Sequence, residues 1–204
     1  FAPMMPNVKS VFELFKKTLS TISNFSYKIG IDVAATELYD KKTNTYQWEK
    51  ETVTAEQLTE IYAEFIKTYP LTLIEDGLSE FDEDGWKKMT VALGDQISLV
   101  GDDIFTTNPM RIRKGVLRKI GNAVLIKPNQ IGTVSQTLAA IDICKHKNLD
   151  FVISHRSGET NDTFISDLAV GTAARYIKAG APSRGERIAK YNRLLAIERV
   201  LETL

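Results

Sequence analysis

The sequence of 204 residues has little of several features that would point to other protein classes. Its one cysteine, Cys144, permits neither an internal disulfide nor a thiolate metal site, so the fold has to rest on packing. No apolar run approaches the roughly 18 residues of a membrane helix, and no secretory signal pattern opens the chain. With 26 basic and 26 acidic side chains, the formal net charge of +0 gives no basic field for nucleic acid. We therefore expect a cytoplasmic globular protein with no membrane span and no nucleic-acid partner.

The sequence does contain short β-branched runs that alternate with longer helical patterns, which is typical of an α/β protein with a parallel sheet. Six strands are predicted, at 27–32, 71–75, 97–102, 123–127, 151–155 and 175–178. The polar, turn-rich stretch 39–53 is predicted to be an inserted hairpin. Because the chain has no internal repeat and no low-complexity linker, we expect one domain over residues 1–204.

Cap and stop residues mark several predicted helices. A helix follows Asn7, and its apolar face from Val8 to Ile22 is expected to pack on the sheet. Another opens with a capping-box pair, Thr54 and Gln57. A third follows Asn108-Pro109 and is expected to stop at Gly121-Asn122. Further helices are predicted over about 132–147, 160–173 and 184–203.

An ionisable residue stands at the carboxyl end of every predicted strand. In order these residues are Asp32, Glu75, Asp102, Lys127, His155 and Lys178. In parallel α/β architectures, side chains from separate strands converge at that edge to form the ligand site. After Glu75 the strand ends recur about every 25 residues, which suits βα units closing into a barrel. We therefore expect the six side chains to form one site.

The residue types at these positions point to a particular chemistry. Asp32, Glu75 and Asp102 form a set of hard oxygen ligands that suits Mg²⁺, with positions left for water and substrate. Lys127 and Lys178 face such a cation, which can lower the proton affinity of an amine as a general base near neutral pH requires. The implied reaction is proton abstraction next to a carboxylate.

The loop 154–160, with the sequence SHRSGET, runs from the fifth strand toward a helix. Its arginine fork, serine hydroxyl and glycine, together with a helix amino terminus, could cradle a phosphate. The alternative is a strand-to-helix turn in which Ser157 and Thr160 merely cap. Glu159, although close to Ser157, is not assigned a catalytic role.

Six stretches carry a resemblance to a known family: IGIDVAATELYD, LIEDGLSEFDEDGW, LVGDDIFTTNP, LIKPNQIGT, ISHRSGETNDTFISDLAVG and IKAGAPSRGERIAKYNRLLAIE. Over nearly its whole length the sequence resembles enolase, the magnesium-dependent lyase of glycolysis that dehydrates 2-phosphoglycerate to phosphoenolpyruvate. The SHRSGE and NQIG motifs are the most specific. The resemblance implies an α/β fold of the enolase TIM-barrel type, with about six of the eight strands, all parallel, in this chain.

The resemblance implies roles for the strand-end residues. Asp32, Glu75 and Asp102 match the family's magnesium ligands, and Glu75 and Asp102 also border the substrate. Lys127 matches the base that removes the proton from carbon 2. Lys178 matches the second lysine, which holds the substrate carboxylate.

Three residues of the SHRSGE motif match substrate contacts: His155, and Arg156 with Ser157 as the phosphate grip. Another superfamily member acting on a different carboxylate would not be expected to carry this motif. The alternatives from other classes are a non-catalytic enolase fragment and a surface or secreted plasminogen-binding protein. The ending Thr203-Leu204, without the usual terminal lysine, argues against the latter.

One family motif is not in the sequence. Enolases carry Gly-Asp-Glu-Gly-Gly directly before the Phe-Ala-Pro that opens this chain as Phe1-Ala2-Pro3, and its glutamate resembles the general acid. We therefore expect the carboxyl-terminal part of an enolase, without the amino-terminal capping domain, from a parent that forms a homodimer or higher homo-oligomer. The chain alone is expected to bind Mg²⁺ weakly and not to turn over 2-phosphoglycerate.

Overall fold

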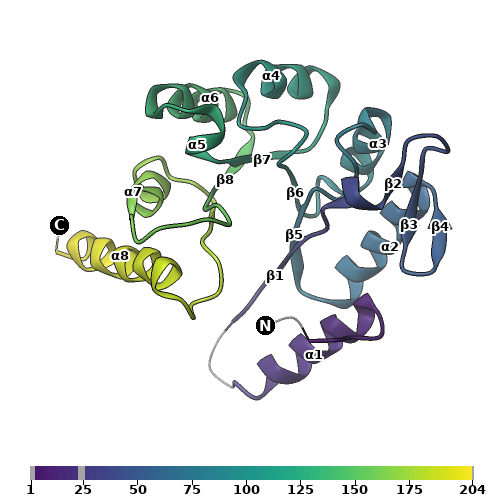
Figure 1. The fold of residues 1–204 in the computed structure, drawn as a ribbon, viewed down its shortest axis with the longest axis horizontal. Helices are drawn as coiled ribbons and strands as arrows, with labels where there is room; N and C mark the ends of the chain where they lie inside the picture. Colours follow the sequence, from purple (N-terminus) through teal and green to yellow (C-terminus); the bar gives the residue numbers. More distant parts are fainter. Residues whose placement is uncertain (1–2, 23–25, 204) are drawn as a thin grey trace. The chain divides into compact units, whose positions relative to one another are not determined.

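The computed structural model describes residues 3–22 and 26–203, and the chain divides into two compact units, Phe1–Leu99 and Val100–Leu204. The expectations drawn from Phe1-Ala2 and from Leu204 lie outside the described residues. In the first unit the elements are α1 (Val8–Ser20), β1 (Ile29–Asp32), η1 (Ala35–Leu38), β2 (Tyr39–Asp40), β3 (Thr45–Trp48), β4 (Glu51–Val53), α2 (Ala55–Thr68), β5 (Leu71–Glu75) and α3 (Glu83–Leu93) (Figure 1). Strand β6 (Ser98–Gly101) crosses from the first unit into the second.

The second unit continues with α4 (Pro109–Arg118), β7 (Ala123–Ile126), α5 (Pro128–Ile131), α6 (Val134–His146), β8 (Asp150–Ser154), α7 (Phe164–Gly171), β9 (Tyr176–Lys178) and α8 (Gly185–Leu201). Its helices follow one another along the outside of its strands (Figure 1). The large sheet has six strands in the order β1-β5-β6-β7-β8-β9, and β1 pairs with β5, β6 with β7, β7 with β8 and β8 with β9 in parallel. The predicted fold class, an α/β partial TIM barrel, is confirmed.

The inserted segment predicted at 39–53 is confirmed as a small antiparallel sheet in the first unit. Strand β3 pairs with β2 on one side and with β4 on the other. Helix α2 follows directly, and its capping box forms as predicted: Thr54 Oγ1 accepts from Gln57 N, and Gln57 Oε1 accepts from Thr54 N. Only the capping residue Thr54 separates β4 from α2, so the short sheet leads directly into the helix.

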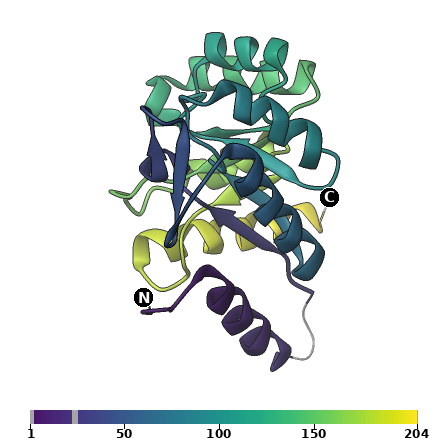
Figure 2. The same cartoon turned by 90° about the vertical axis from the view of Figure 1, so that its right-hand side faces the viewer.

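Helix α1 buries its predicted apolar face only in part. Asn7 caps it as expected, and Phe12 is buried with its ring stacked on Tyr69, the centroids being 4.6 Å apart. Phe15, on the same face, is 51% exposed. The helix lies beside β1 in both ribbon views (Figures 1 and 2), and a cavity of about 650 Å³ is lined by residues of both elements, Phe15 and Ile31 among them. Contacts with the aromatic end of α2 hold α1, rather than close packing on the sheet.

In the second unit, α4 begins as predicted, with Asn108 as its cap and Pro109 at its first position. Its end differs from the prediction, because Lys119 takes the left-handed conformation (φ 58°) two residues before Gly121. A lysine can take this conformation at modest cost, and its N–H then closes the last turn on the carbonyls of Gly115 and Val116. Lys119 therefore ends α4, and Gly121 lies in the segment that follows.

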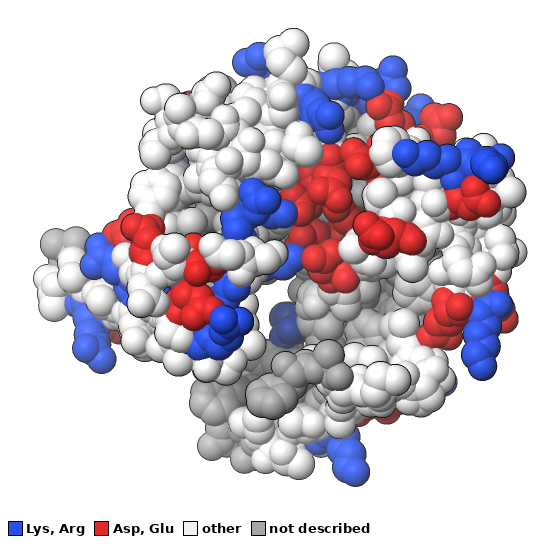
Figure 3. All heavy atoms as spheres, viewed as in Figure 1, with Lys and Arg blue, Asp and Glu red and all other residues white. Residues whose placement is uncertain are grey.

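The core of the second unit includes Val124, Leu125 and Ile126 of β7, all fully buried. Cys144 of α6 is also fully buried, and burial raises the pKa of its thiol to about 12, so it is a packing residue as expected. Side chains of both charge signs lie over α7 and α8 (Figure 3). Among the helices of the described residues, none has the length and apolar character to cross a membrane.

Candidate functional site

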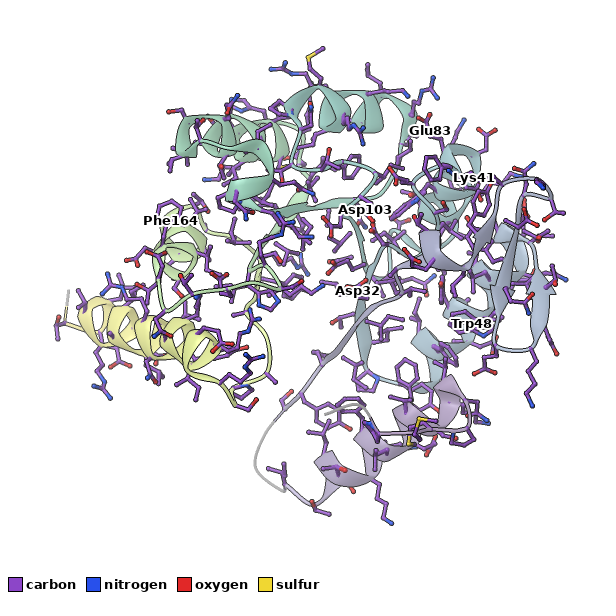
Figure 4. The ribbon with its side chains drawn as sticks, viewed as in Figure 1. Asp32, Lys41, Trp48, Glu83, Asp103 and Phe164 are labelled. Atoms are coloured by element: carbon purple, nitrogen blue, oxygen red, sulfur yellow. The ribbon has the colours of Figure 1, made fainter. Side chains whose placement is uncertain are left out.

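Two of the predicted carboxylates stand side by side in the first unit. Asp32 and Glu75 end β1 and β5, and they are partners in the parallel register of these strands. Register partners on parallel strands direct their side chains to the same face of a sheet. Glu75 is only 3% exposed, whereas Asp32, labelled in Figure 4, is exposed. The first unit thus brings together two of the three carboxylates predicted to bind metal.

The loop that follows Glu75 is held by the polar tips of buried aromatic residues. Tyr62 Oη donates to the carbonyl of Gly77 over 2.9 Å, and Trp86 Nε1 donates to the carbonyls of Leu78 (3.0 Å) and Ser79 (3.1 Å). From the inserted sheet, Tyr46 Oη accepts from Ser79 N over 3.1 Å and donates to Asp82 Oδ2 over 2.8 Å. Tyr46, Tyr62 and Trp86 are fully buried. The inserted sheet therefore helps to hold the loop that starts at the carboxylate of Glu75.

The second unit joins the third carboxylate to the predicted base. Asp102 and Lys127 directly follow β6 and β7, and Lys127 Nζ donates to Asp102 Oδ2. Their side chains are 11% and 16% exposed. Low exposure strengthens a charge pair and limits the positions that a flexible lysine can reach.

A buried threonine fixes the backbone at the predicted base. Thr107 is fully buried and takes a left-handed conformation (φ 55°) in the loop after β6. Its hydroxyl accepts from Lys127 N over 2.9 Å and donates to Gln130 Oε1 over 2.7 Å. The loop after β6 and the loop after β7 are therefore tied together at Lys127.

His155 and Lys178 lie at the ends of neighbouring strands β8 and β9. The strands pair Ser154 with Lys178, and His155 N donates to the Lys178 carbonyl over 2.8 Å. Partial burial, followed by the charges of Arg187 and Lys178, holds the pKa of His155 below its usual 6.5. This histidine is therefore neutral near neutral pH.

The loop that starts at His155 presents the predicted phosphate grip. Arg156 and Ser157 are exposed, and Arg156 Nη1 donates to Asn129 Oδ1 over 2.8 Å. The capping alternative is wrong, because α7 begins at Phe164 (labelled in Figure 4), too late for Ser157 or Thr160 to cap it. The amino terminus of α7 therefore lies outside this loop, contrary to the predicted contribution of a helix amino terminus.

Glu159 is held as an acceptor in the same loop. Its carboxylate accepts from the backbone N–H of Arg156 and Thr160 and lies 3.5 Å from the Nζ of buried Lys190. Burial alone would raise the pKa of Glu159, but these donors together hold it below its usual 4.5. Such a carboxylate is a poor proton donor, which agrees with assigning it no catalytic role.

The described residues fit a hard metal ion by the chemistry of their donors. Asp76, Asp102 and Asp103 each offer a carboxylate oxygen that could serve as a metal ligand. Asp102 and Asp103 belong to the second unit and Asp76 to the first; Asp102 is a predicted ligand, and Asp76 and Asp103 directly follow Glu75 and Asp102. Oxygen-only donors without histidine or cysteine are typical of sites for Mg²⁺ or Ca²⁺ rather than for softer metals.

Several residues that hold the site were not found from the sequence. Thr107, Arg187 and Lys190 form hydrogen bonds to site residues that lie 20, 31 and 30 residues from them along the chain. Asp76 and Asp103 directly follow the predicted ligands Glu75 and Asp102 and were not predicted as ligands themselves. A doubled acidic residue at two successive strand ends, Glu75-Asp76 and Asp102-Asp103, was the one available signal.

A comparison with protein families agrees with this arrangement. The family model described as the enolase C-terminal TIM barrel domain matches residues 1–203. The match covers both units and each strand-end residue described above. The chain therefore belongs to the family of enolase carboxyl-terminal TIM barrel domains.

Proposed function

We propose that this chain carries the proton-abstracting and substrate-holding residues of an enolase, a lyase that converts 2-phosphoglycerate to phosphoenolpyruvate. The observation that supports this best is the order of side chains at the strand ends of the second unit. Asp102, Lys127 and His155 directly follow β6, β7 and β8, and Lys178 ends β9; these four strands pair in this order. Arg156 extends from the loop after β8. A carboxylate, a base and several cationic donors suit a substrate with a carboxylate and a phosphate.

Lys127 is proposed as the base at carbon 2. Its low exposure and the tie of its backbone to Thr107 restrict where its amine can lie. In the proposed step the neutral amine takes the proton of carbon 2, and the electron pair of the C–H bond moves toward the substrate carboxylate. Lys178 is placed one strand beyond His155 and is proposed to bind that carboxylate. None of these residues is proposed as the general acid that protonates the leaving hydroxyl.

We propose Mg²⁺ as the metal, held by Asp32, Glu75 and Asp102, with Asp76 and Asp103 as further oxygen donors. When bound, a divalent cation would stabilise the negative charge that develops on the substrate carboxylate. The residues themselves contribute an acidic pair in the first unit and an acidic residue beside Lys127 in the second.

The proton-abstraction step can be tested alone by hydrogen exchange. In D₂O with Mg²⁺ and 2-phosphoglycerate, the chain should catalyse exchange of the carbon-2 proton of the substrate for deuterium. The rate of this exchange is measured by ¹H NMR. Lys127→Gln should slow exchange at least about 10²-fold, because a positioned base contributes roughly that much. Removal of Mg²⁺ with a chelator should abolish exchange as well.

Lys147→Gln is the matched control, because Lys147 is an exposed lysine of the same unit. It should exchange at the unmodified rate. Exchange that persists in a folded Lys127→Gln chain would rule out Lys127 as the base. No exchange in the unmodified, folded, magnesium-loaded chain would refute the proposed function.

The same proposal includes the organisation of the protein. We propose that residues 1–204 form one barrel domain of an enolase that acts in the cytoplasm as a homodimer or a higher homo-oligomer. Light scattering on the chain would measure its oligomeric state, and a monomer would contradict this proposal.

A further inference from the structure

Arg187 of α8 reaches the loop of the predicted phosphate grip and binds it at three points. Its Nη1 lies 2.5 Å from His155 Nδ1 and donates to the carbonyl of Arg156 over 2.9 Å. Its Nη2 donates to the carbonyl of Ser157 over 2.9 Å. The Arg187 side chain is only 11% exposed. A single guanidinium thus contacts three consecutive residues of the motif.

The chemistry of a guanidinium decides how His155 must be protonated. Arginine has five N–H donors, no acceptor, and no accessible neutral form in a protein. The Nδ1 atom facing Arg187 must therefore be the acceptor, which leaves the proton on Nε2. We propose that Arg187 is a positioning residue that fixes His155 as a neutral Nε2–H donor and sets the backbone that carries Arg156 and Ser157.

The packing around Arg187 restricts its side chain to the position beside His155. Gly180, with φ +86°, follows β9 and packs against both side chains: a Cβ there would lie 2.9 Å from Arg187 Cδ and 3.1 Å from His155 Cε1. The Gly180 carbonyl is in turn held by the hydroxyl of Tyr191, also on α8. The close approach of guanidinium and imidazole therefore depends on a position without a side chain.

The charges around His155 act in the same direction. Burial is the largest effect that lowers its pKa, and Arg187, Lys178 and Lys127 lower it further, whereas Glu159 opposes them. A proton added at Nδ1 would face the donors of Arg187 directly. Both geometry and charge thus favour a histidine that donates one hydrogen bond and does not act as an acid.

Where the proposed function holds, this inference deepens it by assigning His155 a defined task. A neutral Nε2–H can donate to an oxygen of an anionic substrate without supplying or removing a proton. The same arginine holds the carbonyls of Arg156 and Ser157, so the donor and the phosphate grip are oriented by one side chain.

The tautomer can be measured directly, because the chain has only two histidines. Two-bond ¹H–¹⁵N NMR spectra distinguish Nδ1 from Nε2 protonation, and a chain with His146→Gln assigns the signals, since His146 is exposed on α6. The unmodified chain should show His155 protonated at Nε2, with a titration midpoint below 6.5. In Arg187→Gln the midpoint should rise toward 6.5 and the tautomers should mix.

Arg187→Lys separates charge from geometry. A lysine keeps the positive charge but loses the fork, so the midpoint should stay low while the preference for Nε2 weakens. Protonation of His155 at Nδ1 in the unmodified chain would overturn the inference, even if neither variant folds. An unchanged tautomer in a folded Arg187→Gln chain would overturn it too. A chain that shows the Nε2 tautomer but no carbon-2 exchange would refute the proposed function and leave this inference standing.

Discussion

Replacing Thr107 by valine removes a hydroxyl from the site while preserving shape. Thr107 is fully buried, accepts from Lys127 N over 2.9 Å and donates to Gln130 Oε1 over 2.7 Å. Valine has the same branching at Cβ, so the cost of the left-handed conformation at φ 55° is similar in both chains. The substitution therefore isolates the two hydrogen bonds and opens no cavity.

The magnitude follows from those two bonds. An intramolecular hydrogen bond contributes about 1 kcal/mol net, and a buried donor left without an acceptor costs about 1–3 kcal/mol. The backbone N–H of Lys127 is the donor left behind. We expect Thr107→Val to lower the free energy of unfolding by about 2 kcal/mol, which for a chain of this size lowers Tm by about 4–8 °C.

Urea denaturation followed by circular dichroism measures this difference, and Thr107→Ser is the matched control because it retains the hydroxyl. The serine chain should stay within about 1 kcal/mol of the unmodified protein. Carbon-2 exchange should also slow in the valine chain, since Lys127 loses a constraint. A valine chain as stable as the unmodified protein, or a serine chain destabilised as much as the valine chain, would show that the hydroxyl of Thr107 does not stabilise the site.

Two further predictions concern groups at the loops of the site. Tyr46→Phe removes the hydroxyl that bonds Ser79 N and Asp82, and should lower the free energy of unfolding by about 1–3 kcal/mol in urea denaturation. A change below about 0.5 kcal/mol would show that this contact does not hold the loop. Because the pKa of Glu159 is lowered in the folded state, its stabilising contribution is full above its usual 4.5 and is lost as the pH falls through the lower folded value. Glu159→Gln should therefore reduce the loss of stability between about pH 5 and about pH 3, and an unchanged acid profile would contradict the shift.

Local signals in the sequence predicted much of the fold. The run at 71–75 coincides with β5, and the Thr54 and Gln57 pair forms the capping box that its spacing predicts. These features depend on residues within a few positions of one another. Short elements were harder to find: α5 is a single turn opened by Pro128, and nothing in its four residues separates it from a loop.

The candidate site was predictable in its strand-end residues but not in what holds them. Residues at the ends of strands can be located from the hydrophobic pattern, because a strand ends where its apolar run ends. Thr107 and Arg187 contact site residues that lie 20 and 31 residues away along the chain. Contacts over such separations depend on how the elements pack, which local sequence patterns do not specify. The loop before α7 is likewise tied to α8, 30 residues away along the chain, through Lys190, and α7 begins only at Phe164.

The lone buried thiol of Cys144 has a practical consequence for following this protein. A thiol with a pKa of about 12 in the folded state is almost unreactive toward alkylating reagents, whereas the same thiol in an opened chain reacts readily. Its rate of modification therefore reports how often α6 separates from the strands that it covers. The molecule carries its own single-site label for local opening, with no competing cysteine elsewhere in the sequence.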